Sequence, residues 1–73
     1  MDKMIELTAL RWITITGRGV FAEIEPAQLH DQTIHVGDHV VIDGAEKVIT
    51  GIEFVDYRAE RIANLALLLS DPH

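Results

Sequence analysis

Apolar and polar residues alternate with a period of two along most of this chain, and this alternation restricts its fold more than any other feature. The odd positions of residues 5–15 are mainly apolar, and the pattern returns at residues 20–25. Successive side chains of a strand point to opposite faces, so the pattern predicts strands. Residues 5–15 form either one long strand or two strands that bend near Ala9. We expect their odd positions to lie inward.

The stretch ITITGRGV, residues 13–20, places an arginine between two glycines. A glycine-rich phosphate loop opens a helix, and its P-loop form continues with lysine and a hydroxyl residue. Here a second strand pattern follows Gly19. The stretch therefore predicts a turn between two strands, with Arg18 at its tip.

Turn signals divide the middle of the chain. Pro26 ends the preceding strand because it has no N–H for the ladder, and residues 26–32 read as a polar loop with room for one helical turn. Asp43 and Gly44 predict a hairpin between strands at residues 40–42 and 47–55. Gly51 indicates a bulge in the second of these strands.

The segment of residues 57–70 allows two interpretations. Good helix formers place four apolar residues on one stripe, as in an amphipathic helix: Ile62, Leu65, Ala66 and Leu69. The same residues also fit a polar loop followed by a buried strand at residues 64–69. The local pattern leaves both open.

Size and composition predict a single globular domain, residues 1–73. The 48% hydrophobic content excludes a disordered tail, and without cysteine there is neither a disulfide nor a thiolate zinc site. A domain of this size buries only about 60% of the surface that its unfolded chain exposes. A dimer or a larger partner would supplement such a small core.

The formal net charge of -6, from 12 acidic and 6 basic residues, disfavours nucleic acid as a partner. Nucleic-acid binders concentrate positive charge, because phosphate neutralisation supplies much of their affinity. A protein partner or a homodimer is the better expectation. The start MDKMIEL lacks a signal-peptide pattern, and the longest apolar run, residues 65–69, is far below the roughly 20 residues of a membrane span. We therefore predict a cytoplasmic protein without membrane contact.

Four short motifs, taken in order, resemble domain two of the translational GTPases, the β-barrel of the elongation factor Tu family. They are TGRG at residues 16–19, TIHVGD at 33–38, TGIE at 50–53 and NLALLL at 64–69. The resemblance implies an all-β fold, a small closed antiparallel barrel of six or seven strands, and makes residues 64–69 a strand. It covers the barrel and not the GTPase domain, so it implies no catalysis. Compared with the family, residues 26–32 look inserted.

The same resemblance implies one alternative function. Domain two of the family helps to hold the 3′ end of aminoacyl-tRNA, and Glu53 matches the glutamate that lies at the terminal nucleotide. An RNA-binding module would use Arg11, Arg18 and Glu53. The family's following arginine is Asp56 here, and this change from a cation to an anion weakens any contact with a phosphate backbone.

Three bulky apolar residues interrupt the alternation: Leu10, Trp12 and Phe21. We expect them on the outer faces of two adjacent strands, where cross-strand neighbours touch and would form one exposed patch. Alternatively, barrel curvature or the loop of residues 26–32 would cover these three residues. An exposed patch with a tryptophan is typical of an interface. The predicted function is a non-catalytic binding module that acts through a protein partner or self-association.

A third function class is a small metal-binding protein. Five potential ligands lie close in sequence: His30, Asp31, His35, Asp38 and His39. Gly37 and the strand pattern argue against the helix that would bring His35 and His39 together. Ser70, the one serine, has no nucleophile-elbow motif around it. We therefore predict no metal, no cofactor and no catalytic residue.

Overall fold

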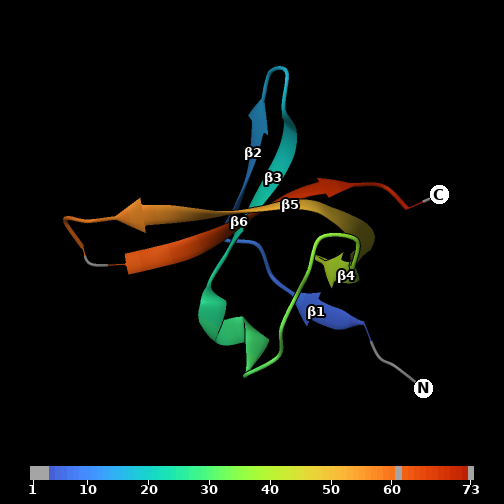
Figure 1. Cartoon of the computed structure of the whole chain (residues 1–73), viewed down its shortest axis with the longest axis horizontal. Coiled ribbons are helices and arrows are strands. Elements are labelled where there is room, and N and C mark those ends of the chain that lie inside the picture. The colour runs from blue at the N-terminus through green and yellow to red at the C-terminus, as the bar shows by residue number, and fades with distance from the viewer. Residues whose placement is uncertain (1–3, 61, 73) are drawn as a thin grey trace.

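The computed structural model describes residues 4–60 and 62–72 (Figure 1), and this part of the chain contains strands and one short 3-10 helix, η1 (Pro26–Leu29). The strands are β1 (Ile5–Leu7), β2 (Arg11–Ile15), β3 (Gly19–Ile24), β4 (His39–Ile42), β5 (Ala45–Tyr57) and β6 (Ile62–Ser70). They form one six-stranded sheet in the order β1-β4-β5-β6-β3-β2. The all-β prediction is confirmed. In the described residues, no helix has the length and apolar character to cross a membrane.

The C-terminal segment is a turn followed by a strand, so the helical interpretation is wrong. β6 pairs antiparallel with both β3 and β5 and lies inside the sheet. Four successive residues from Asn64 to Leu67 are buried, which means that both faces of the strand are covered. Burial on both faces explains the continuous apolar run, and this tertiary context overrides the helix propensity of the residues.

The predicted turns are confirmed at the expected glycines. Gly17 and Gly19, at the β2–β3 hairpin, have φ values of 84° and 121°, and the Arg18 N–H donates to the Ile15 carbonyl at 3.0 Å. Asp43 and Gly44 both have positive φ, 52° and 85°, as a two-residue hairpin requires. The register of β5 against β6 shifts between residues 49 and 51, which confirms the bulge.

The sheet is not closed by strand pairing, and in this respect the predicted barrel is not shown. β1 and β2 lie at opposite ends of the strand order, yet residues 8–10 join them directly. β1 pairs with β4 in parallel, whereas every other neighbouring pair is antiparallel. Each neighbouring pair from β2 through β3, β6 and β5 to β4 is antiparallel, so β4 runs in the same direction as β2. β1 continues into β2 in that same direction, so its pairing with β4 is parallel.

Side chains from two distant segments hold the bend at residues 8–10. The Gln28 amide accepts from the Thr8 N–H at 2.8 Å and donates to the Thr8 carbonyl at 2.7 Å. The Asp43 carboxylate accepts from the Ala9 N–H at 3.1 Å. The Leu10 N–H donates to the Glu23 carbonyl at 2.8 Å. Gln28 belongs to the segment that looked inserted, so this segment secures the bend.

One cluster of buried apolar side chains forms the core, with members from five strands: Leu7, Ala22, Ile24, Val40, Ile42, Ile49, Leu65, Leu67 and Leu69. The inward odd positions are confirmed for β1, where Leu7 is buried and Ile5 packs against the cluster. They are wrong for β2. Ile13 lies opposite Phe21, and both point to the face of the sheet opposite to that of Ala22, which belongs to the core cluster. The bend at residues 8–10 separates the two strands, so the alternation does not carry across it.

Candidate binding surface

The three residues predicted to form one exposed patch lie on two faces of the sheet. Leu10 and Trp12 are exposed, with 50% and 42% of their surfaces accessible, whereas Phe21 is 3% exposed. Trp12 lies opposite Ala22, and Phe21 lies opposite Ile13, so Trp12 and Phe21 point to opposite faces. The expectation of a single Leu10/Trp12/Phe21 patch is therefore wrong.

Phe21 is buried by its neighbours on the second face. Ile13 and Leu68 lie directly across from it on the two adjacent strands. The Arg18 guanidinium lies 5.0 Å from the centre of its ring. The alternation pattern considers each position separately. It therefore cannot show which side chains the two flanking strands place over Phe21.

An exposed apolar surface does exist around Trp12, with a different second member. Val20 is 39% exposed and is paired with Thr14, which lies on the same face as Trp12. Trp12 and Val20 are diagonal neighbours on adjacent strands and line one shallow groove of about 130 Å³ together with Leu69. We call Trp12, Val20 and this groove the Trp12 surface.

Charged and polar groups form the other side of the groove: Lys47, Ser70 and Asp71. Lys47 and Asp71 form an ion pair. The hydrogen bond from Lys47, together with its charge, lowers the pKa of the Asp71 carboxyl. The Trp12 surface is thus an apolar strip beside a salt-bridged rim, the arrangement common in protein interfaces.

The indole of Trp12 is fixed in orientation. Its Nε1–H donates to Asp43 Oδ2 at 2.8 Å, and the other oxygen of this carboxylate accepts from the Ala9 N–H. The only polar group of the side chain is therefore satisfied within the fold. The exposed remainder of the ring is apolar and already held in place, so an interface that buries it loses little side-chain entropy.

β2 is an end strand with one side unpaired in the described chain. Its sequence, RWITI, is rich in β-branched and aromatic residues, and Ile15 is 40% exposed on the face opposite Trp12. Figure 1 shows the β2–β3 hairpin extending beyond the β5–β6 pair. Unpaired strand edges present N–H and C=O groups that pair readily with another chain. Together with the Trp12 surface, this edge is the candidate binding region.

The structure brings together two of the residues expected to bind RNA, but as partners of each other. Arg18 and Glu53 form an ion pair at the β2–β3 turn. Arg11, on the same face of the sheet, donates through Nε to Glu23 Oε1 at 2.7 Å. Each arginine therefore has a carboxylate partner, which reduces the positive charge available to a phosphate.

Glu23 is the polar residue that sequence reasoning missed. It is 2% exposed, and three side chains from other strands donate to its carboxylate. Arg11 donates at 2.7 Å, the Tyr57 hydroxyl at 2.9 Å and Asn64 Nδ2 at 2.8 Å. Arg11 also donates to the Tyr57 hydroxyl. Because β2 and β3 form a hairpin around residues 16–18, Arg11 and Glu23 lie directly opposite each other. The register of that hairpin was the sequence signal that could have predicted their pairing.

The pKa of Glu23 results from opposing causes. Burial raises it, whereas the hydrogen bonds from Asn64 and Arg11, with the charge of Arg11, lower it. The lowering causes together outweigh burial, so the pKa lies below its ordinary value. Glu23 is therefore an ionised carboxylate at neutral pH, held between strands β2, β3, β5 and β6.

The histidines are used in local contacts. His39 Nδ1 lies 2.7 Å from Glu46 Oε2 across the β4–β5 pair. The backbone N–H of His35 donates to Asp38 Oδ2 at 2.8 Å within a turn. Within residues 4–60 and 62–72, no group of three or more His, Cys, Asp or Glu side chains is placed to hold a metal ion.

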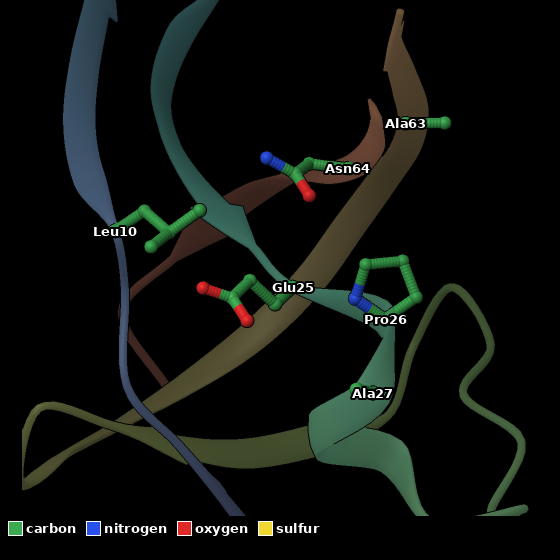
Figure 2. Close-up of a pocket in the computed structure, with 6 residues that line it drawn as sticks. All are labelled: Leu10, Glu25, Pro26, Ala27, Ala63 and Asn64. Carbon is green, nitrogen blue, oxygen red and sulfur yellow. The ribbon is translucent and has the colours of Figure 1, made fainter. Parts of the chain in front are cut away.

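A larger pocket lies beside the bend (Figure 2). Its volume is about 480 Å³, and its lining comes from the bend, the β3–η1 junction and the start of β6: Leu10, Glu25, Pro26, Ala27, Ala63 and Asn64. Leu10, predicted as part of the exposed patch, thus belongs to this pocket. Asn64 also donates to Glu23, so the pocket borders the buried carboxylate.

Comparisons with protein-family models, with curated proteins and with solved structures gave no match. The resemblance to domain two of the translational GTPases therefore depends on the four sequence motifs alone.

Proposed function

We propose that this chain is a non-catalytic binding module that acts on a protein partner or on a second copy of itself through the Trp12 surface. The exposed indole of Trp12 on an end strand carries the proposal. Tryptophan is among the residues most enriched at the energetic centres of interfaces. Here the residue is 42% exposed although its indole N–H already has a partner inside the fold.

Two further observations support a protein as the partner. The unpaired side of β2 offers backbone groups, and its β-branched residues suit strand addition by an extended segment. The net charge of -6 disfavours a polyanion. We retain the expectation that the chain acts without a cofactor and in the cytoplasm.

We also propose that the fold is a translation-factor-like barrel in which the continuous segment of β1 and β2 substitutes for a closing strand pair. The four ordered motifs support this relationship, as does the bend that Asp43 and Gln28 hold. The RNA-binding alternative is less favoured, because both arginines that it needs are paired with carboxylates.

A single substitution tests the binding function. Trp12→Ala removes the indole at the centre of the Trp12 surface, and Phe54→Ala is the matched control, because Phe54 is 77% exposed on β5. Sedimentation velocity over a range of concentrations gives the mass of each protein, and affinity capture from a lysate of the source cells gives its partners. We expect self-association or a captured partner with wild type and Phe54→Ala, weakened at least about tenfold in Trp12→Ala.

Two results would contradict the proposal. The first is an association that Trp12→Ala leaves unchanged. The second is a wild-type chain that stays monomeric and captures nothing. Circular dichroism of both variants separates a loss of binding from a loss of fold.

A further inference from the structure

The pocket beside the bend has the features of a specific site. It opens between the bend, the start of η1 and the start of β6, and Pro26 turns the chain away from the sheet at its border. Alanine at positions 27 and 63 leaves the space unfilled. Its volume of about 480 Å³ lies within the range of ligand sites, roughly 300–1,000 Å³.

Asn64 supplies a polar group that is buried and oriented. The residue is 6% exposed, and its Nδ2 donates to Glu23 Oε2 at 2.8 Å. An ionised carboxylate only accepts hydrogen bonds, so the amide nitrogen must face Glu23 and the amide oxygen must face the other way. Figure 2 shows this oxygen on the side of Glu25 and Pro26. No described residue donates to this oxygen, and it is not among the fully buried atoms that lack a partner, because the described residues contain none.

Glu25 adds a carboxylate at the border of the same space. Its side chain is exposed, and no ion pair to it is present within the described residues. Figure 2 shows the side chains of Leu10, Asn64 and Glu25 directed into one space. The oriented polar groups of the pocket are therefore one anion and one carbonyl acceptor, beside the apolar surfaces of Leu10 and Pro26.

This combination selects among ligands. An anion is repelled by Glu25, and an apolar ligand would remove the Asn64 oxygen from water without giving it a donor, which is costly. One carboxylate and one amide oxygen are too few for Ca²⁺, which takes six to eight oxygen ligands. A primary ammonium group on an aliphatic stem satisfies both acceptors, and its methylene groups can contact Leu10 and Pro26.

We propose that this pocket binds a lysine side chain of the protein partner, with the ammonium group between Glu25 and the Asn64 oxygen. The inference rests on the proposed function, because the pocket would give the chain a preference for a partner with an exposed lysine. Charge supports it, because the net charge of -6 favours the approach of a basic segment. Leu10 immediately precedes β2, so a partner paired along that strand passes close to the pocket.

A titration with capped amino acids tests the pocket without the partner. The probes are Nα-acetyl-lysine methylamide and its norleucine analogue, which has the aliphatic stem without the ammonium group. Asn64 is the only asparagine in the sequence, so its side-chain amide gives an identifiable signal in ¹⁵N-correlated NMR spectra, with Gln32 as the internal reference. At constant ionic strength, we expect a saturable shift of the Asn64 signal, with the lysine probe bound about fivefold more tightly than norleucine.

Matched charge variants complete the test. Glu25→Gln should weaken the lysine probe about threefold, whereas Glu6→Gln, an exposed glutamate on β1, should leave it unchanged. Equal binding of the two probes, no shift at Asn64, or equal effects of the two variants would overturn the inference. Trp12→Ala should bind the lysine probe like wild type. Failure of the Trp12 surface in the association experiment is therefore distinguishable from failure of the pocket.

Discussion

A single buried carboxylate connects four strands of this small sheet. Glu23 on β3 accepts from Arg11 on β2, Tyr57 on β5 and Asn64 on β6. No buried side-chain nitrogen or oxygen in the described residues lacks a hydrogen-bond partner. A fully satisfied network of this kind fixes the relative register of its strands, because every member requires the others in place.

Glu23→Gln should destabilise the fold at neutral pH by about 1–3 kcal/mol, because the glutamine amide has one acceptor oxygen instead of two and its NH2 group would face a donor. The pKa of Glu23 is lowered in the folded state, so its ionised form contributes stability at pH values above the unfolded-state pKa, about 4.3. This contribution is lost as the pH falls through the folded pKa. Urea unfolding of wild type and Glu23→Gln between about pH 7 and 3 measures the difference.

We expect the difference in unfolding free energy to be largest near neutral pH and to shrink below about pH 4. Glu6→Gln, at an exposed position, is the control and should follow wild type at every pH. A difference that stays constant on acidification would show that the charge of Glu23 is not what stabilises the network.

At the scale of elements, three of the motifs that carry the family resemblance meet in space. A Cβ atom at Gly19, in TGRG, would lie 3.2 Å from Leu68 Cδ1, and one at Gly51, in TGIE, would lie 3.3 Å from Leu68 Cβ. Leu68 belongs to NLALLL. Arg18 of TGRG and Glu53 of TGIE also form an ion pair. Residues of these three motifs thus form the contacts among the β2–β3 hairpin, β5 and β6.

Gly19→Ala should therefore cost more stability than Gly17→Ala. Both positions have positive φ, which costs an alanine about 1–2 kcal/mol. Only the Cβ at position 19 would also crowd Leu68, since a Cβ at position 17 meets nothing within 4 Å. Urea unfolding of the two variants gives their difference. Leu68→Val removes the Cδ1 atom, and in that background the difference should shrink.

An equal cost for the two glycine variants, or a difference that Leu68→Val leaves intact, would mean that backbone conformation alone explains both positions. Gly51→Ala provides a steric comparison without positive φ, because its added Cβ would meet the less adaptable Cβ atom of Leu68.

The sequence predicted those elements whose signals are local. Glycines and Asp43 located the turns, and alternation located the strands. Which face a residue occupies was predictable only within one uninterrupted strand. Phe21 was therefore assigned to the wrong face, and the pairing of Arg11 with Glu23 was missed, because both depend on the register across the hairpin. The pocket at Leu10 depends on three distant segments and left no local signal.

At the scale of the whole molecule, charge is the property that most restricts partners. The net charge is -6, and the two arginines expected to contact RNA are each held by a carboxylate. A polyanion would have to approach against the net charge and compete with both ion pairs.

We therefore expect no binding of tRNA or of single-stranded RNA even at about 50 mM salt, where phosphate contacts are strong. Fluorescence anisotropy of labelled RNA measures this directly. Binding in the micromolar range that weakens steeply with added salt, and that Arg18→Gln reduces, would favour the RNA-binding alternative over the Trp12 surface.

The bend at residues 8–10 has a consequence for the shortest strand. β1 has three residues and one parallel pairing, too little to stay docked as a separate peptide. Its three-residue connection to β2 makes it a ligand tethered beside its own binding site. The pairing of β2 with β3 therefore supplies β1 to β4 at a high effective concentration, on the order of millimolar for short linkers. β1 therefore stays paired with β4 at one edge of the sheet because β2, at the other edge, holds the connection of residues 8–10 in place.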